Sequence, residues 1–388
     1  MRHEKILAII LGFGLLGGCA SNQSAKQGQA PRALAPAQTK PVETSKPSMA
    51  PKGKKIALLV PLSGAQSDLG KSLLKASQMA IFDGGATDIT LMPIDTRGTP
   101  EGASLAAQKA LDQNAEMILG PVFSKEVGAV KSIAASRQIP VISFTTDMSV
   151  LGGGAYSLGF MPAQQVERIL SFAASQGMDT IVTVTPTTDY GRVVDQTVQG
   201  VVQKGQVKSA GSFHYGPQDL TLGSPALITL TGQIKDAHGK GAKAIFFPEA
   251  GVPLETLSQA LAGAGLSQMK ILGTGQWDGP QVSAIPSLQG GLFAAPDPGA
   301  RTRFESKFRA SFQQVPPRIA SLAYDGTALA ISLAPKGYEV SSLTSSQGFM
   351  GSDGLFRLKG DGSSERGLAV LEVGQGGVRV INGAPARF

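Results

Sequence analysis

Short apolar runs and longer amphipathic segments alternate along this sequence from Lys55 almost to its end. Lys55–Pro61 is an apolar run that ends in a turn, which is typical of a buried parallel strand, and Leu69–Phe82 repeats apolar residues at the period of a helix. The same rhythm predicts further strands at 89–94, 117–119, 140–144, 180–185, 207–214, 244–247, 270–273 and 292–294. It also predicts helices at 100–114, 125–137, 192–204, 225–238, 253–264, 302–312 and 319–333, and a β-rich end at 355–358, 368–373 and 378–381.

Such alternation predicts an α/β protein built on doubly wound sheets with flanking helices. About 335 residues are many for one sheet, so we expect two lobes.

Basic residues concentrate before residue 56, although the net charge of +7 belongs to the whole chain. Residues 1–55 hold 9 of the 35 Lys and Arg residues and 2 of the 28 Asp and Glu residues, which leaves 26 of each in 56–388. A neutral body with 6% aromatic residues lacks the basic surface and the stacking platforms that nucleic-acid binding needs. The sequence therefore predicts no nucleic-acid partner.

Motifs typical of enzymes and metal sites are missing from the sequence. The chain has one Cys and three His, at positions 3, 214 and 238, and it has no HExxH, GxSxG or Walker A motif. The string Gly12–Gly17 fits GxGxxG, but no strand precedes it, so it does not indicate a dinucleotide loop. We therefore predict a non-enzymatic protein with no catalytic residue, no cofactor and no metal.

The first 18 residues have the layout of an export signal. A charged start, Met1–Lys5, precedes the uncharged run Ile6–Gly18, which is too short to span a bilayer comfortably. The sequence Leu16-Gly17-Gly18-Cys19 resembles the bacterial lipobox, in which a diacylglycerol alkylates the Cys thiol. This resemblance implies a lipid anchor on Cys19 and, because Ala20 rather than Asp follows it, an outer-membrane lipoprotein facing the periplasm. The alternative is an ordinary signal peptide with a chance cysteine.

Residues 19–53 are rich in Pro, Ala and Lys and contain no aromatic residue. Because they show no apolar periodicity, they cannot bury enough surface to fold, and we predict a disordered linker. The folded part is then expected at 54–388.

Hydroxyl groups follow several predicted strands at the point where each strand ends. Ser63 follows the first strand, Ser124 comes after the third, and Thr145 and Thr146 come after the fourth. Hydroxyls and backbone N–H groups at helix starts can hold a carboxylate, and ligands of doubly wound sheets bind at the carboxyl ends of strands. For any single residue, a helix cap or a turn is the simpler interpretation.

Four strings in order resemble the type I periplasmic binding proteins of the leucine/isoleucine/valine class over roughly residues 54–380. They are IALLVPLSG, GPVFS, IPVISFTT and the step Asp189-Tyr190-Gly191. The resemblance implies a two-lobed fold in which each lobe is a doubly wound, mainly parallel sheet with flanking helices. It also implies interleaved lobes, with lobe one at about 54–160 and 281–350 and lobe two at about 161–280 and 351–388.

The resemblance implies an interlobe cleft lined by Ser63, Ser124, Thr145, Thr146 and Tyr190, with Ser124 donating to a ligand carboxylate. The aromatic residue that this class has in the cleft falls on Leu69, and the acid that holds a ligand ammonium falls near Gly275–Gln276. A buried ammonium without that acid lacks its charge partner, so we do not expect a free α-amino acid as ligand.

Two further residues are candidates for the cleft. Glu249 follows the strand that contains Phe246 and Phe247, and it could replace the missing acid or lie in a solvated loop. Trp277, the only tryptophan, could line the cleft or fill the hinge between the lobes.

A narrower resemblance rests on the segments ILGTGQWDGP, FAAPDP, PPRIASLAYD and Gly351–Val373. These are similar to the lipoproteins called penicillin-binding protein activators. That resemblance implies a non-enzymatic envelope lipoprotein that regulates peptidoglycan synthesis by binding a penicillin-binding protein. The alternative function is the solute-binding component of an ABC transporter for amino acids or another small polar ligand.

Overall fold

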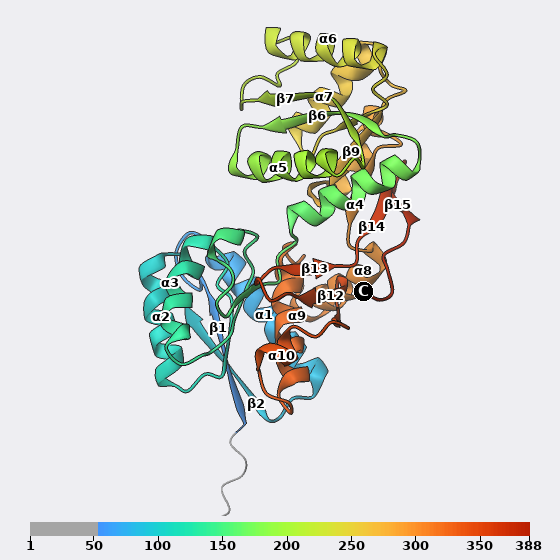
Figure 1. Cartoon of the computed structure of the whole chain (residues 1–388). Coiled ribbons are helices and arrows are strands. Elements are labelled where there is room, and N and C mark those ends of the chain that lie inside the picture. Colours follow the sequence, from blue (N-terminus) through green and yellow to red (C-terminus); the bar gives the residue numbers. More distant parts are fainter. Residues whose placement is uncertain (1–52) are drawn as a thin grey trace, which may run out of the picture. The chain divides into compact units, whose positions relative to one another are not determined.

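The computed structural model describes residues 53–388, which form two α/β lobes (Figure 1). The predicted signal peptide, almost all of the predicted linker and the lipidation site Cys19 lie outside the described residues. Within the described part, none of the helices combines the length and the hydrophobicity that crossing a membrane requires.

Lobe one is built on a parallel five-stranded sheet in the order β2-β1-β3-β4-β5. Its strands are β1 Lys54–Val60, β2 Ile89–Asp95, β3 Met117–Leu119, β4 Val141–Ser143 and β5 Ala155–Ser157. Alternate residues of β1 enter two different cores. Ile56 and Leu58 pack with α1 (Ser67–Gly84) and α9 (Ala320–Leu333), whereas Ala57 and Leu59 pack with α2 (Pro100–Asp112) and α3 (Ser124–Ala135). The continuous apolar run at 55–61 is thus a strand covered on both faces.

Segments from the second half of the chain complete lobe one. Helices α8 (Pro298–Phe312) and α9 pack on its core through Phe304, Phe308 and Leu329. The short helix α10 (Val340–Leu343) and a small antiparallel sheet of β11 (Phe349–Gly351), β12 (Gly354–Leu358) and β13 (Ser364–Arg366) follow.

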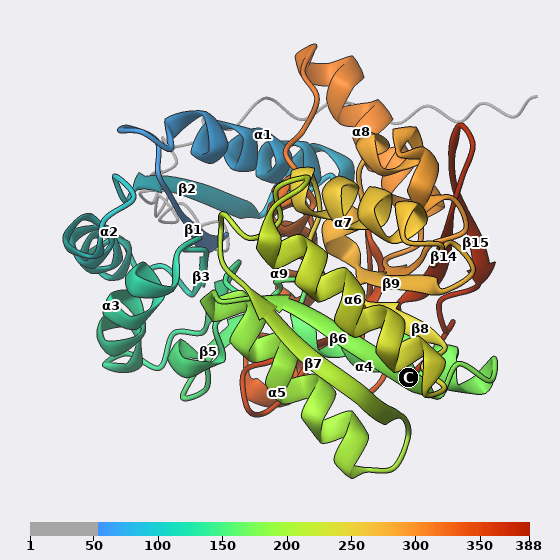
Figure 2. The same ribbon diagram turned by 90° about the horizontal axis from the view of Figure 1, so that it is seen from above.

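Lobe two contains a seven-stranded sheet in the order β15-β14-β10-β9-β8-β6-β7. All its neighbours are parallel except β10–β14 and β14–β15. The strands are β6 Thr180–Pro186, β7 Lys208–Tyr215, β8 Ala244–Phe246, β9 Lys270–Thr274, β10 Leu292–Ala295, β14 Ala369–Gly374 and β15 Gly377–Asn382. Helices α4 (Pro162–Ser175) and α5 (Asp189–Gln203) cover one face, and α6 (Pro225–Gly239) and α7 (Val252–Gly263) cover the other (Figures 1 and 2).

The expected fold class is confirmed, but two of the expected lobe boundaries need correction. The segment 281–350 was expected in lobe one, yet its strand β10 pairs with β9 and β14 in the lobe-two sheet. The segment 351–388 was expected in lobe two, yet Phe356 and Leu358 of β12 pack in the lobe-one core. The chain therefore returns to lobe one after β10 and enters lobe two again only at β14.

Three short segments connect the lobes, at 158–161, 296–297 and 367–368. Side chains join the first and third of them. The guanidinium of Arg366 donates to the carbonyl of Leu158 at 2.7 Å, and the backbone N–H of Arg366 donates to the side chain of Gln164 at 3.0 Å. Arg168 donates to the carbonyl of Leu368 at 2.9 Å. The connecting segments are thus tied to one another by hydrogen bonds.

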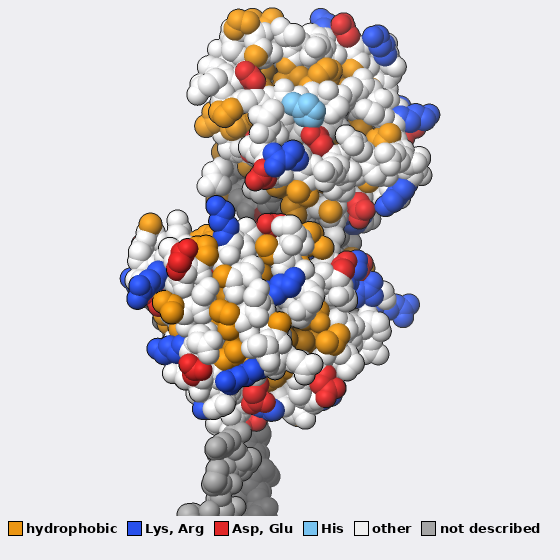
Figure 3. Space-filling model, turned by 60° about the vertical axis from the view of Figure 1, so that its left-hand side comes forward, with side chains coloured by type: hydrophobic (Ala, Val, Ile, Leu, Met, Phe, Trp, Pro, Cys, Tyr) orange, Lys and Arg blue, Asp and Glu red, His pale blue; other side chains and the backbone are white. Residues whose placement is uncertain are grey.

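Charged side chains are dispersed over the face shown in Figure 3, with both signs mixed and no large patch of one sign. This distribution agrees with the equal numbers of acidic and basic residues in 56–388.

Candidate functional site

A cavity of about 290 Å³ lies between the two lobes, beside the connecting segments. Both lobes contribute to its wall because each sheet ends there, as expected for ligand sites of doubly wound sheets. Its lining combines apolar side chains with a few polar ones: Phe144, Thr146, Gly159, Phe160, Pro162, Gln165, Tyr190, Gly275, Gln276, Asp278, Pro296, Arg318, Ile319 and Leu322.

Tyr190 enters the cavity wall from the first turn of α5. Its phenolic oxygen lies 2.9 Å from Oγ1 of Thr274 and donates to the carbonyl of Pro248 at 3.3 Å. Burial, opposed by the hydrogen bond with Thr274 and assisted by the charge of Glu249, raises the pKa of Tyr190 to about 12. The phenol is therefore a neutral hydrogen-bonding group near neutral pH.

Gln165 fixes the loop that follows β9 against the first connecting segment. Its side-chain oxygen accepts a hydrogen bond from the N–H of Gly275 at 2.7 Å, and its amide nitrogen donates to the carbonyl of Phe160 at 3.0 Å. Because Gln165 is buried and both ends of its amide are bonded, it positions Gly275 and Gln276 at the cavity.

Asp278 and Arg318, an acid and a cation of the cavity wall, are paired directly. Oδ2 of Asp278 accepts hydrogen bonds from Nη1 of Arg301 and from Nε of Arg318, both at 2.9 Å. The guanidinium of Arg318 also lies 3.9 Å from the ring centre of Phe160, a cation–π contact.

Arg318 lies next to a cluster of buried charged side chains. Nη1 of Arg318 is 3.0 Å from Oδ1 of Asp353, and Asp325 and Arg366 are buried beside it. Burial raises the pKa of Asp325 to about 6, and the charge of Asp353 adds to the rise. Burial lowers the pKa of Arg366, although the two carboxylates oppose that change.

Two of the residues predicted for the cleft, Thr146 and Tyr190, line this cavity.

The other hydroxyl groups predicted for the cleft have different hydrogen-bond partners. Thr145 is buried and accepts a hydrogen bond from the N–H of Asp147 at 3.1 Å. Ser63 donates to Oδ2 of Asp95 at 2.6 Å. Ser124 begins α3 outside the cavity lining and faces the Asp147 carboxylate.

The carboxylate of Asp95 organises the loop that contains Ser63. Besides the Ser63 hydroxyl, it accepts from the backbone N–H groups of Leu62 and Arg97 at 2.8 Å each. Burial alone would raise the pKa of Asp95, but these hydrogen bonds together hold that pKa below its usual value. The Ser63 hydroxyl is thus used within its own lobe.

Glu249 and Trp277, each of which had an alternative place outside the cleft, do not line this cavity. The Glu249 carboxylate accepts a hydrogen bond from the Tyr215 hydroxyl inside lobe two. Trp277 is fully buried in the lobe-two core, where its Nε1 donates to the carbonyl of Glu249 at 2.8 Å. The apolar indole gains more from this core than from a cavity wall.

Three residues of the cavity wall were not predicted from the sequence: Gln165, Asp278 and Arg318. Asp278 lies three residues after Gly275, where the resemblance places an acid, and that proximity was the one available signal. Gln165 lies in a segment without a recognisable motif, and Arg318 lies in the segment PPRIASLAYD, whose resemblance to a family does not single it out, so only the fold brings them to the cavity.

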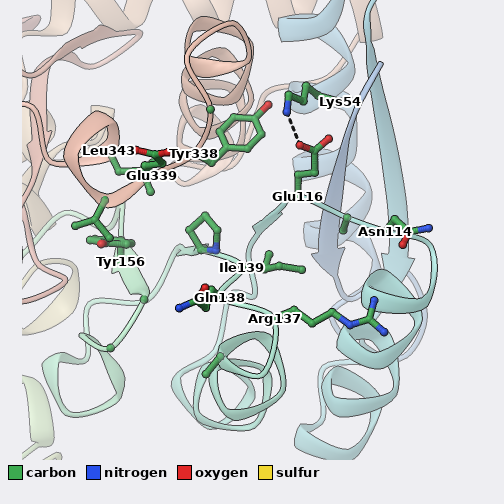
Figure 4. Close-up of a pocket in the computed structure, with 17 residues that line it drawn as sticks. Lys54, Asn114, Glu116, Arg137, Gln138, Ile139, Tyr156, Tyr338, Glu339 and Leu343 are labelled. Carbon is green, nitrogen blue, oxygen red and sulfur yellow. Dashed lines mark hydrogen bonds and ion pairs between the residues drawn. The ribbon is translucent and has the colours of Figure 1, made fainter. Parts of the chain in front are cut away.

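A larger cavity of about 820 Å³ lies at the amino ends of the lobe-one strands (Figure 4). Lys54 and Glu116 form an ion pair on its wall, and Tyr156 and Tyr338 contribute aromatic surface. None of the residues predicted for the cleft lines it. Nowhere in residues 53–388 are three or more His, Cys, Asp or Glu side chains arranged to hold a metal ion.

Solved structures with the same fold include a putative branched-chain amino acid ABC transporter of Rhodospirillum rubrum. It has a TM-score of 0.76 and 18% identity and covers 85% of this chain and 100% of its own. A solute-binding protein of Rhodopseudomonas palustris in complex with benzoate has a TM-score of 0.59 and 19% identity, covering 87% and 97%. LivJ of Streptococcus pneumoniae in complex with isoleucine has a TM-score of 0.59 and 18% identity, covering 85% and 100%.

The sequence comparisons add a relative and a family. An uncharacterized protein of Rickettsia prowazekii (strain Madrid E) is 24% identical over 161 residues, which are 41% of this chain and 43% of that protein. The match thus spans less than half the length of this curated relative. The family model "Periplasmic binding protein" matches residues 54–347. With the two-lobed fold and the cavity between its lobes, this match shows that the chain belongs to the periplasmic binding protein family.

Proposed function

We propose that this chain is a solute-binding protein of the bacterial envelope that holds a small organic anion in the cavity between its lobes. The observation that carries the proposal is Arg318, a cation in a cavity wall to which Thr146, Tyr190 and Gln276 add neutral hydrogen-bonding groups. Arginine binds carboxylates well because its planar donors match the two carboxylate oxygens.

The acid at the cavity favours an anion over a free α-amino acid. Asp278 already accepts hydrogen bonds from two arginines, so its charge is neutralised before a ligand ammonium arrives. A cavity of about 290 Å³ is at the small end of the range for ligand sites, which favours a compact ligand. Benzoate and isoleucine, bound by two proteins of the same fold, are both compact carboxylates.

The proposal places the protein at the membrane through the lipid anchor on Cys19, with the outer membrane as its destination. This part rests on the lipobox-like sequence and on Ala20. The periplasmic binding protein family is consistent with a chain that works outside the cytoplasm.

Calorimetric titration of the full-length protein with benzoate and with isoleucine tests the proposed function. We expect benzoate to bind, and we expect Arg318→Gln to weaken binding by about 1.5–3 kcal/mol, the value of a hydrogen bond to a charged group. Arg303→Gln, which changes an exposed arginine of α8, is the matched control and should bind as the wild type does. If no small carboxylate gives heat with the wild type, the proposal is wrong.

A second candidate function is the regulation of a penicillin-binding protein. The segments that resemble the activator lipoproteins meet at the cavity, where they contribute Asp278, Pro296 and Arg318. Crosslinking in intact envelopes, followed by purification of the full-length protein, tests this function. A penicillin-binding protein that co-purifies equally with the wild type and with Arg318→Gln would favour regulation through the outer surface over solute binding.

A further inference from the structure

We infer that Asp278 is an internal competitor: its carboxylate pairs with Arg318 in the cavity wall, and an anionic ligand binds there by displacing it. The inference rests on the proposed function, because it names how the same cavity is regulated. It assigns to Arg318 the contact with the ligand and to Asp278 the control of access to that contact.

The ion pairs of Asp278 join the two lobes. Asp278 follows β9 and the buried Trp277, so it belongs to lobe two, whereas Arg301 lies on α8 and Arg318 precedes α9 in lobe one. The side chains of Asp278 and Arg301 are each 17% exposed and that of Arg318 is 25% exposed, so solvent screens these pairs less than surface pairs.

Arg318 is held in place from its own lobe. Asp353 is 3.0 Å away on the lobe-one side, and the ring of Phe160 lies against the guanidinium. Arg301 is likewise paired with Glu305 on the same helix at 2.6 Å. Loss of Asp278 would therefore leave both arginines ordered, and it would free a donor of Arg318, which lines the cavity. Such preorganised donors bind an anion with little further ordering.

Asp278 has no comparable support from lobe two. Its backbone N–H donates to the carbonyl of Gly275 at 3.1 Å, but within residues 53–388 the hydrogen bonds to its carboxylate come from the two lobe-one arginines. A ligand carboxylate offers these arginines the same charge and the same acceptor atoms. Two carboxylates next to each other repel, so ligand binding and the Asp278 ion pairs exclude one another.

This exclusion predicts in which direction the affinity for benzoate changes when Asp278 loses its charge. Asp278→Asn keeps the shape of the side chain but removes its charge, so benzoate no longer competes with an internal carboxylate. We expect the variant to bind benzoate about tenfold more tightly than the wild type, as removal of a competing buried charge pair would allow. Asp236→Asn, on the exposed face of α6, is the matched control and should not change the affinity. Equal or weaker benzoate binding by Asp278→Asn overturns the inference.

Titration with isoleucine distinguishes two roles of Asp278, an internal competitor and an acid that binds a ligand ammonium. If the wild type binds isoleucine and Asp278→Asn loses that binding, Asp278 recognises a ligand ammonium and the inference is overturned. If benzoate binds to both proteins and more tightly to Asp278→Asn, the inference is supported.

Hydrogen–deuterium exchange of the ligand-free protein separates failure of this inference from failure of the proposed function. Because the ion pairs join the lobes, Asp278→Asn should speed exchange at 275–279 and at the connecting segment 158–161, whereas Asp236→Asn should not. If exchange is faster in Asp278→Asn but neither benzoate nor isoleucine binds, the proposed function and the competitor role are contradicted. The ion pair then remains as a contact that joins the lobes. If exchange is unchanged and neither compound binds, the proposed function, the competitor role and the lobe-joining contact are all contradicted.

Discussion

The indole ring of Trp277 lies so close to Gly273 that a β-carbon on Gly273 would be 2.2 Å from the ring. Gly273 is in β9, and Trp277 is the last residue of the 3₁₀ turn Gly275–Trp277 that follows this strand. The ring also packs against Phe293 of the neighbouring strand, with ring centres 5.8 Å apart. The only tryptophan of the chain is thus part of the lobe-two core, next to the loop that carries Asp278.

Gly273→Ala should lower the free energy of unfolding by about 1–3 kcal/mol, because the added methyl group overpacks a filled core. Urea unfolding followed by the fluorescence of Trp277 measures this change. Gly232→Ala is the matched control, since no neighbouring atom lies within 4 Å of a β-carbon on Gly232 in α6. The control should be neutral or slightly stabilising. Equal stability of Gly273→Ala and the wild type would show that the indole moves aside without cost.

Arg366→Met should destabilise the protein by about 3–5 kcal/mol, because it removes the buried cation whose charge offsets those of Asp325 and Asp353 and leaves Arg318 as the one cation beside these acids. Methionine fills a similar volume, so the change tests charge more than packing. Thermal and urea unfolding measure the loss. Arg303→Met removes an exposed arginine of α8 and should change stability little. A loss below about 1 kcal/mol for Arg366→Met, the usual value for a surface pair, would contradict the role of the cluster.

Much of the fold could be predicted from local patterns. The run at Lys55–Pro61 and the helical period at Leu69–Phe82 correspond to β1 and α1 within one or two residues. The assignment of β10 to a lobe could not be predicted in this way. Its four residues form a short apolar run, and whether such a run pairs in one sheet or the other depends on partners that are distant in sequence.

The site was less predictable than the fold. Thr146 and Tyr190 could be found because they follow strands and match a known family. Ser63 and Ser124 follow strands as well, but nearby aspartates occupy their hydroxyls, and a sequence pattern does not show this. The contact between Asp278 and Arg318 joins residues 40 positions apart, and each of them alone looks like a turn residue.

The folded protein should resist tyrosine ionisation. Burial raises the pKa of all five tyrosines, that of Tyr190 to about 12, whereas unfolded tyrosine titrates at about 10. A phenol whose pKa is raised by folding stabilises the folded state fully below the unfolded pKa. That contribution is lost as pH rises from 10 through the folded pKa.

A pH titration followed by absorbance at 295 nm should therefore show little tyrosinate in the native protein at pH 10.5. In 8 M urea the tyrosines should be extensively ionised at that pH, because free tyrosine is half-ionised at about pH 10. Urea unfolding at pH 8 and at pH 10.5 should show lower stability at the higher pH. Tyr190→Phe removes one of the five phenols and should reduce the pH dependence in proportion. Native titration at the pH of free tyrosine would show that these phenols are open to solvent.

Cys19→Ser should abolish lipid modification, because a serine hydroxyl cannot replace the thiol that the diacylglycerol alkylates. Expression of the full-length chain in a bacterium with labelled palmitate tests this: the wild type should incorporate label, and Cys19→Ser should not. Ala20→Ser keeps the thiol and should be labelled like the wild type, which controls for expression and export. Label is a sharper readout than membrane partitioning, because an uncleaved signal peptide can itself hold a protein at the membrane. Labelled Cys19→Ser would show that the lipid is attached elsewhere, and an unlabelled wild type would mean that residues 16–19 resemble a lipobox by chance.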